Sequence, residues 1–328
     1  MLSIETSCDE TAIAVVRKDG ERFVVEKDLV ASQIKEHAKY GGVVPEVAAR
    51  MHMEALFPML EESGVPRDGS GIDGVAVTAG PGLVVALRVG VETAKALSVF
   101  WQKPLVAVNH LEGHILSAWL GTHSPSLPLL ALLVSGGHTE FILVPEIGTY
   151  RVIGQTRDDA AGEAFDKVAK LLELGYPGGP AVSKIAAQGS DDAIAFPRPM
   201  LDQENLDVSF SGLKTAVLKE VRSGSHRPED VAASFQEAVV ETLIEKTRRA
   251  VEQTHPASLA LVGGVSANRR LRARFQTLAH EHNLVAHIPD VHYCTDNAVM
   301  IAVAGAFALE RGDIVDPLKL KPDPDLPL

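Results

Sequence analysis

Two histidines four residues apart carry the clearest chemical signal in the sequence. His110 and His114 are separated by one helical turn within the segment 109–114. Side chains at positions i and i+4 of a helix project from the same face, so both imidazoles could bind one metal ion. Asn109 is a suitable N-cap for this helix. The spacing alone is equally compatible with two histidines on a helix surface, so a metal site needs a further ligand.

Glu112 separates this segment from the motif of the zinc proteases. In that motif a glutamate directly follows the first histidine, whereas Leu111 occupies this position here. A residue two positions after His110 lies about 200° around the helix. Glu112 is therefore expected to point away from the metal-binding face, and the zinc-protease interpretation fails on geometry.

Asp296 is the candidate third ligand. It precedes an expected helix at 298–310, so its carboxylate can project from the tip of an element. Two histidines and one aspartate with open positions suit a divalent metal, such as zinc or iron, that also holds substrate. The alternative is that Asp296 or Asn297 caps the helix.

Three glycine-rich loops are candidates for nucleotide binding. Ser135, Gly136 and Gly137 could surround a phosphate with backbone N–H groups. The loop 176–180 allows close approach of a ring or ribose, and Asn268, at the end of the loop 263–268, could contact a base edge. The sequence contains no Walker A loop and no GxGxxG after a strand.

Asp166 lies in an expected helix near these loops in the chain order. Its carboxylate is a candidate for binding ribose hydroxyls. The alternative is a solvated acid on the helix surface.

The elements that carry these residues recur in the two halves of the chain. Hairpins with polar or glycine-rich tips are expected at 2–16 and 129–144. A strand, a glycine loop and a helix follow at 75–99 and again at 259–280. Recurrence in the same order indicates an internal duplication. It predicts the α/β fold of the actin, sugar-kinase and Hsp70 superfamily, with two similar lobes around a nucleotide cleft.

We expect one lobe at 1–118, with 297–328 packing back on it, and the other at 119–296. Further helices are expected at 47–62, 161–174 and 228–253. Pro58 should kink or break the first, and Gly175 should cap the second. The proline-rich tail 319–328 is expected to fray.

Composition restricts the functional classes. No apolar run reaches the roughly 18–20 residues of a membrane span, and the N-terminus lacks the pattern of a secretory signal. The two cysteines, Cys8 and Cys294, form no CxxC motif, and a reduced compartment suits them. We therefore expect a cytoplasmic protein.

The net charge of −12, from 31 basic and 43 acidic residues, opposes nucleic-acid binding. Basic residues are nevertheless gathered in two places. These are Arg269, Arg270, Arg272 and Arg274, and Lys214, Lys219, Arg222 and Arg227. An equally good interpretation is that some of them only balance neighbouring acids.

Together, these motifs resemble those of the universal tRNA threonylcarbamoyltransferase family, once labelled O-sialoglycoprotein endopeptidase. The matching segments follow one another over nearly the whole chain, at 4–11, 40–46, 109–114, 134–139, 158–167, 209–215, 263–268 and 294–297. The sequence of residues 158–167 is similar to that of bacterial members rather than archaeal ones.

The resemblance implies the actin-like fold and a metal-dependent acyltransferase that modifies the adenosine beside the anticodon of tRNA. It implies one divalent metal, Fe²⁺ or Zn²⁺, at His110, His114 and Asp296. It also implies that threonylcarbamoyl-AMP contacts Leu133, Val134, Ser135, Gly136, Gly137, Asp166, Gly179 and Asn268. ATP or ADP as a further ligand is left open.

The implied partners are tRNA, a TsaB-like inactive paralogue that packs on the N-terminal domain, and a TsaE-like P-loop ATPase. A homodimer is left open, and no membrane is involved.

Three positions depart from the family pattern: Ser3 replaces a usual glycine, Ser183 replaces a common aspartate, and Leu133 stands where archaeal relatives have a tyrosine.

In the implied reaction, the adenosine amine attacks the carbamoyl carbon and AMP leaves. Asp9 or Glu10, on the first hairpin tip, could accept the amine proton or orient the adenosine; Asp9 is preferred, although a structural role in the turn is nearly as plausible. Two alternatives remain at this point: an ATP-dependent kinase or carbamoyltransferase of the same superfamily, and a catalytically inactive paralogue that serves as a scaffold.

Overall fold

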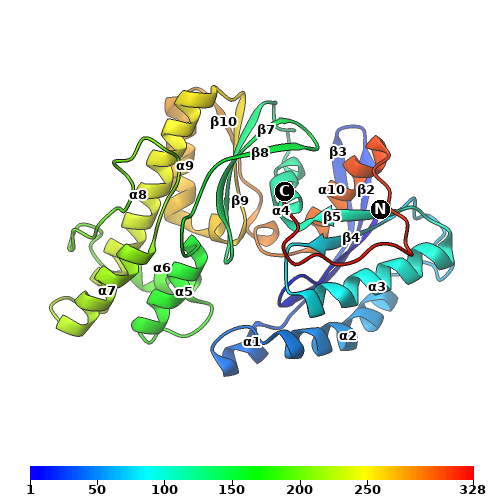
Figure 1. Ribbon diagram of the computed structural model, residues 1–328, viewed down its shortest axis with the longest axis horizontal. Coiled ribbons are helices and arrows are strands. Elements are labelled where there is room, and N and C mark those ends of the chain that lie inside the picture. Colours follow the sequence, from blue (N-terminus) through cyan, green and yellow to red (C-terminus); the bar gives the residue numbers. More distant parts are fainter. The chain divides into compact units, whose positions relative to one another are not determined.

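The computed structural model describes residues 1–328, which form two compact units (Figure 1). Unit 1 consists of Met1–Ser124 and Thr295–Leu328, and unit 2 of Pro125–Cys294. The divisions therefore fall after residues 124 and 294 rather than after 118 and 296. Trp119 packs edge-on against Phe307 at 6.0 Å within unit 1, which keeps the residues after 118 with this unit.

Unit 1 is built on a five-stranded mixed sheet in the order β3-β2-β1-β4-β5. Its strands are β1 (Leu2–Glu5), β2 (Glu10–Asp19), β3 (Arg22–Ser32), β4 (Val75–Gly80) and β5 (Leu105–Asn109). β1, β2 and β3 form an antiparallel meander, whereas β4 and β5 run parallel to β1. The hairpin expected at 2–16 is thus confirmed.

Helices cover the two faces of this sheet. They are α1 (Ile34–His37), α2 (Pro45–Glu62), α3 (Val84–Trp101), α4 (His110–Leu116) and α10 (Ala298–Arg311), with short 3₁₀ helices η1 (Ala38–Tyr40) and η2 (Ser117–Leu120). Ile4 packs in a core with residues of α2 and α3. The adjacent residue of β1, Ser3, donates its hydroxyl to the carbonyl of Ala298 at the start of α10. The alternation of β1 therefore places α10 on the opposite face from α2 and α3.

Unit 2 repeats this arrangement. Its sheet has the order β10-β9-β6-β7-β8, with β6, β7 and β8 antiparallel and β6, β9 and β10 parallel. The strands are β6 (Leu129–Val134), β7 (Thr139–Glu146), β8 (Thr149–Gln155), β9 (Ser258–Val262) and β10 (Val285–His287). The matching orders and directions confirm the internal duplication.

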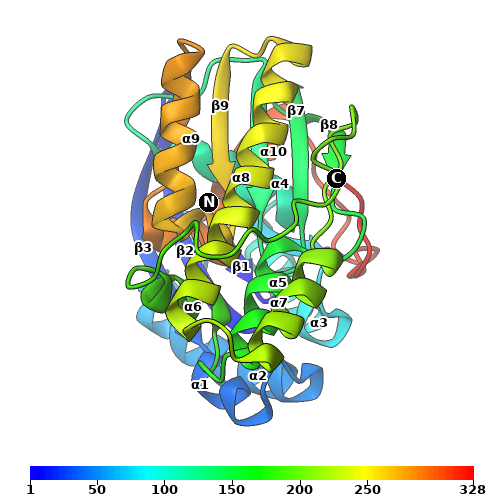
Figure 2. The ribbon, with the colours of Figure 1, turned by 90° about the vertical axis from the view of Figure 1, so that its left-hand side faces the viewer.

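The helices of unit 2 enclose its main hydrophobic core. They are α5 (Ala161–Leu171), α6 (Gly178–Ala186), α7 (Ser211–Ser223), α8 (Pro228–Thr254) and α9 (Arg269–Glu281), with 3₁₀ turns η3 (Gly264–Ala267) and η4 (Val291–Tyr293). Figure 2 shows α8 and α9 side by side, in agreement with their packing contacts. Phe165 of α5 meets Phe235 of α8 edge-on at 5.1 Å.

One expected helix boundary was wrong. α2 ends at Glu62, as expected, and continues through Pro58 without a break. α5 ends at Leu171, before Gly175, because Glu173 adopts a left-handed conformation with φ of 57°. The N–H of Leu174 then bonds back to the carbonyl of Ala169 at 2.9 Å, which closes the helix.

The C-terminal tail is docked rather than frayed. The N–H of Asp323 donates to the carbonyl of Ala79 at 2.8 Å, and Asn109 Nδ2 donates to the carbonyl of Pro327 at 2.9 Å. A Cβ on Gly80 would lie 1.8 Å from the Asp323 carbonyl oxygen, so this close approach requires glycine. Backbone hydrogen bonds to β4 therefore order the tail.

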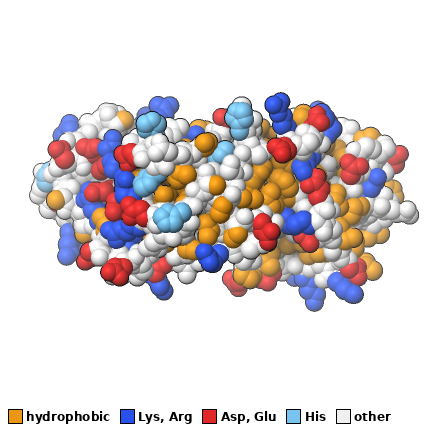
Figure 3. All heavy atoms as spheres, turned by 90° about the horizontal axis from the view of Figure 1, so that it is seen from above, with side chains coloured by type: hydrophobic (Ala, Val, Ile, Leu, Met, Phe, Trp, Pro, Cys, Tyr) orange, Lys and Arg blue, Asp and Glu red, His pale blue; other side chains and the backbone are white.

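Acidic and basic side chains are mixed on the surface. On the face drawn in Figure 3, Lys and Arg side chains are interspersed with Asp and Glu and do not form one continuous basic patch. None of the helices combines the length and the apolarity needed to cross a bilayer.

Candidate metal centre and nucleotide loops

The start of α4 is set by Asn109, as the sequence predicts. Its side-chain oxygen accepts the backbone N–H of Leu111 at 2.8 Å, which satisfies one of the unpaired donors of the first turn. The capped helix begins at His110 and places His114 one turn later on the same face. The two imidazole rings lie 4.7 Å apart, centre to centre, at an angle of 82°.

Asp296 completes a cluster of three candidate ligands within unit 1. Its Oδ1 atom lies 3.4 Å from His110 Nε2 and 3.2 Å from His114 Nε2. One ligand atom from each residue lies within 4.8 Å of the other two. The structure thus brings together the three residues expected to bind a metal.

Two features of the backbone allow this convergence. Asn297, and not Asp296, caps α10 by accepting the N–H of Met300 at 2.9 Å, which leaves the Asp296 carboxylate available. Gly113 lets α4 approach α10 closely, because a Cβ there would lie 2.8 Å from Ile301 Cδ1. Glu112 lies away from the cluster and contacts Arg311 at 3.7 Å.

Burial and neighbouring charges shift the pKa values of all three candidate ligands. Burial would lower the pKa of His110, but the carboxylates of Asp296 and Glu5 outweigh it and raise this pKa well above its usual value. Burial lowers the pKa of His114, which favours the neutral ring. Burial opposes ionisation of Asp296, yet the charge of His110 and the close approach of both histidine rings lower its pKa.

His114 provides a direct indication that the cluster fits a cation. Its ring is 1% exposed, and neither Nδ1 nor Nε2 has a hydrogen-bond partner, since the 3.2 Å approach to Asp296 lacks hydrogen-bond geometry. Buried polar atoms without a partner are rare and costly. A divalent ion bound to Nε2 and to the Asp296 carboxylate would satisfy one of them and offset the buried negative charge.

Glu5 was not singled out from the sequence, although it belongs to the same cluster. It lies in β1, is fully buried, and its Oε2 atom is 3.0 Å from His110 Nδ1. The sequence signal that could have identified Glu5 is a charged residue at the end of the otherwise uncharged, buried strand Leu2–Glu5. Burial would raise the pKa of Glu5, but the charge and hydrogen bond of His110 lower it.

His52 of α2 contacts residues on both sides of Asp9 and Glu10 in the hairpin tip. His52 Nε2 lies 3.1 Å from the Cys8 carbonyl oxygen, and its Nδ1 lies 2.8 Å from Thr11 Oγ1. Burial and the nearby charge of Asp9 raise the pKa of Glu10 to about 9. The Glu10 carboxyl is therefore protonated at neutral pH and cannot act there as a proton acceptor.

In unit 2, the loop Ser135–Gly137 packs against the start of α5. Gly162 donates its N–H to the carbonyl of Ser135 at 3.2 Å, and a Cβ on Gly162 would lie 2.5 Å from this oxygen. Glycine-rich loops of this kind can bind phosphate through backbone N–H groups. At the start of α5, the N–H groups of Ala161 and Gly162 are already bonded, to Thr139 Oγ1 and to the Ser135 carbonyl. The side chains of Leu133 and Val134 are buried in β6, so only their backbone can contact a ligand.

Asp166 and Gly179 are neighbours within unit 2. Asp166 Oδ1 accepts the N–H of Gly178 at 2.7 Å and so caps the start of α6. A Cβ on Gly178 would lie 2.5 Å from Asp166 Cα, which explains the glycine at this crossing. The carboxylate expected to bind ribose is thus also a structural cap.

Asn268 likewise has structural bonds. Its Oδ1 accepts the N–H of Leu271 at 3.0 Å, and its Nδ2 donates to Ser183 Oγ at 3.0 Å and to Gln236 Oε1 at 2.9 Å. Ser183, the departure from the family pattern, therefore contacts the very residue expected to meet the base. Gln236 was missed because nothing in its helical sequence context marks it.

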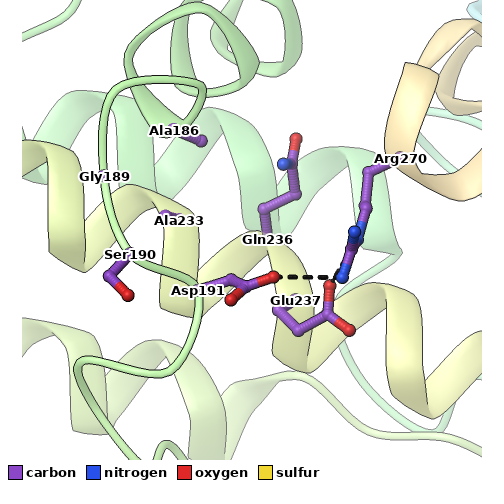
Figure 4. A pocket seen from close by; sticks show the side chains of 8 residues that line it. All are labelled: Ala186, Gly189, Ser190, Asp191, Ala233, Gln236, Glu237 and Arg270. Carbon is purple, nitrogen blue, oxygen red and sulfur yellow. Dashed lines mark hydrogen bonds and ion pairs between the residues drawn. The ribbon is translucent and has the colours of Figure 1, made fainter.

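Gln236 also lines a cavity of about 320 Å³ in unit 2 (Figure 4). Arg270 lies at its edge and bonds to Asp191 at 3.0 Å and to Glu237 at 2.7 Å. Arg274 bonds to the same Glu237 at 2.7 Å. These arginines, from one of the two basic clusters of the sequence, are neutralised by neighbouring acids.

The arrangement of the strands and helices is that of the actin-like ATPase fold. Two solved structures match 94% of this chain. HypF of T. kodakarensis has a TM-score of 0.65 at 15% identity, and the chain spans about half of its length, 48%. Component A of (R)-2-hydroxyglutaryl-CoA dehydratase from Acidaminococcus fermentans has a TM-score of 0.53 at 13% identity, with 96% of its length covered.

The family described as tRNA N6-adenosine threonylcarbamoyltransferase matches residues 25–303. A relative of this name from Anaeromyxobacter dehalogenans is 52% identical, with 99% of this chain and 98% of the relative covered. The chain belongs to the tRNA N6-adenosine threonylcarbamoyltransferase family.

Proposed function

We propose that this chain transfers the threonylcarbamoyl group from threonylcarbamoyl-AMP to the exocyclic amine of the adenosine beside the anticodon of tRNA. The observation that carries this proposal is the family match over nearly the whole chain. In the reaction, the amine nitrogen bonds to the carbamoyl carbon and the bond from this carbon to the phosphate oxygen breaks. AMP leaves with the bonding electrons, and the amine loses one proton.

His110, His114 and Asp296 would hold one divalent metal ion, Fe²⁺ or Zn²⁺. The partnerless nitrogens of His114 support this assignment, as does the nitrogen and oxygen donor set. Such an ion neutralises anionic substrate oxygens and polarises a carbonyl.

The residues of unit 2 would bind the adenylate. The backbone of Leu133–Gly137 suits the phosphate, Asp166 and Gly179 suit the ribose, and Asn268 suits the base. Because Asp166 and Asn268 are already bonded within unit 2, they are held in fixed positions before the ligand arrives.

The amine proton needs an acceptor. The raised pKa of Glu10 keeps its carboxyl protonated at neutral pH, which leaves Asp9 as the candidate acceptor on the hairpin tip. Glu10 would then orient the adenosine as a hydrogen-bond donor.

The acidic chain is proposed to need partners for efficient tRNA binding. A TsaB-like paralogue and a TsaE-like P-loop ATPase are the partners that the family resemblance implies. A tRNA substrate supports a cytoplasmic location. A homodimer is the alternative assembly.

The proposal is tested by incubating the chain and these partners with threonylcarbamoyl-AMP and unmodified tRNA. Mass spectrometry of the digested tRNA should detect threonylcarbamoyladenosine, with one AMP released for each modified nucleoside. AMP release without a modified nucleoside would limit the activity to hydrolysis and contradict the proposal.

A further inference from the structure

Glu5 is surrounded by hydrogen-bond donors. Its Oε2 atom accepts from Thr78 Oγ1 at 2.7 Å and lies 3.0 Å from His110 Nδ1. Its Oε1 atom accepts the backbone N–H of Ser7. The side chain is fully buried, so no water replaces these partners. A carboxylate that accepts from Thr78 and Ser7 has its remaining lone pairs available for His110.

This environment determines which ring nitrogen of His110 carries the proton. A carboxylate oxygen can only accept, so Nδ1 must donate its hydrogen to Glu5. Ser7 Oγ, at 3.3 Å, is a weaker neighbour of the same nitrogen. When Nδ1 carries the hydrogen of a neutral imidazole, Nε2 presents its lone pair, and Nε2 is the atom that faces Asp296.

His114 has no comparable support. Neither of its ring nitrogens makes a hydrogen bond, and its one polar contact is the 3.2 Å approach of Nε2 to the Asp296 carboxylate. The two histidines of α4 therefore differ: His110 is fixed in direction and tautomer by a buried carboxylate, and His114 is not.

We propose that Glu5 is a positioning residue that holds His110 with Nδ1 protonated and Nε2 directed at the metal, and that Thr78 holds Glu5 in turn. The inference rests on the proposed metal site, but not on the reaction that the site serves. Carboxylates behind metal-bound histidines fix the ring and increase its basicity, and their loss typically weakens metal binding by about 10–100-fold.

The test compares zinc dissociation constants of three variants of the full chain, measured by competition with a chromophoric chelator. Glu5→Gln brings an amide NH₂ among donors and should weaken zinc binding by about 10–100-fold. Thr78→Val leaves the carboxylate in place but removes one of its anchors, and should weaken binding by a smaller factor. Glu112→Gln, the same acid-to-amide change on α4 itself, is the matched control and should leave the constant unchanged.

A second readout separates positioning from a general structural role. Two-bond ¹H–¹⁵N spectra of the metal-free protein, recorded at a pH above the raised pKa of His110 so that the ring is neutral, report the tautomer of each histidine. A His110→Gln variant assigns the His110 signal. The wild type should show the proton on Nδ1, and Glu5→Gln should lose this preference. If Glu5→Gln does not fold, Thr78→Val carries the test in both measurements.

The outcomes distinguish this inference from the proposed function. Zinc constants of Glu5→Gln and Thr78→Val within twofold of the wild type would overturn the role of Glu5 alone. A wild type that binds zinc tightly with His110 protonated on Nδ1, but does not modify tRNA, would overturn the function and leave the role of Glu5 intact.

Discussion

Asp296 Oδ1 lies 3.2 Å from His114 Nε2, and this contact joins the two chain segments that build unit 1. α4 belongs to the first segment, and Asp296 opens the second, whose helix α10 packs against the sheet. A metal bound between them would link the two segments directly. Folding of unit 1 and metal binding should therefore be coupled.

Zinc should consequently raise the melting temperature of the protein. A ligand that binds only the folded state at 100 times its dissociation constant adds about 2.7 kcal/mol of stability. Removal of the metal with a chelator should reverse this increase, as measured by differential scanning calorimetry. Asp296→Asn should abolish the zinc-dependent increase, and an equal increase in this variant would exclude Asp296 as a ligand.

Glu10 should make the stability of the protein depend on pH. Its pKa is raised from 4.5 to about 9 in the folded state, so the folded protein binds more protons than the unfolded chain between these values. The free energy of unfolding should therefore fall as the pH rises from about 5 to 9.

Glu10→Gln carries a neutral side chain at every pH and should reduce this fall. Urea unfolding at pH 5, 7 and 9 provides the measurement. A wild type and a variant with parallel stability profiles would contradict the raised pKa.

Gly162→Ala should disturb the phosphate loop. The new Cβ would lie 2.5 Å from the Ser135 carbonyl oxygen, so the backbone of the loop or of α5 must shift. We expect a loss of about 1–3 kcal/mol in the free energy of unfolding and weaker AMP binding in calorimetry. Gly212→Ala is the control, because its Cβ would meet only Pro199 Cγ at 3.5 Å. Equal AMP affinity in all three proteins would argue against the loop as the phosphate site.

Four of the eight clustered basic side chains are paired with acids and are not free to bind tRNA. Lys214 pairs with Asp159, Arg227 with Asp230, and Arg270 and Arg274 with Glu237. Lys219, Arg222 and Arg269 make no such pair. Binding of tRNA by the isolated chain should therefore be weak and strongly salt-dependent.

Filter binding at several salt concentrations tests this expectation. Lys219→Ala should weaken tRNA binding and reduce the log–log salt slope by up to about 0.9 if the side chain contacts a phosphate. Arg274→Ala, which breaks an ion pair within the protein, should change the slope less. Tight, salt-insensitive binding by the isolated chain would contradict this account of the charge.

The sequence predicted the elements whose signals are local. Hairpin tips, the Asn109 cap and the i, i+4 histidines depend on neighbouring residues, and all are present in the structure. The recurrence of hairpin and strand–loop–helix units was sufficient to infer the duplicated sheet. Asp296 was identified as a ligand candidate through its place at the tip of a helix and through the family resemblance.

Features that depend on tertiary contacts were predicted poorly. The tail was expected to fray because its prolines exclude regular structure, yet hydrogen bonds to Ala79 and Asn109 order it. Glu5 lies within an apolar strand, and only the folded structure shows that Thr78 and His110 surround its carboxylate. Gly175 was a reasonable cap, but Glu173 ended the helix first.

The most direct test of the central claim is a metal titration of transfer activity. The protein is stripped of metal, and Fe²⁺ or Zn²⁺ is added in steps while threonylcarbamoyladenosine in tRNA is measured by mass spectrometry. Activity should rise linearly to one equivalent per chain and then level off. His110→Ala and His114→Ala should show little activity at any metal concentration while remaining folded. Full activity of the stripped wild type, or of the doubly substituted protein, would contradict the assignment of the metal centre to His110, His114 and Asp296.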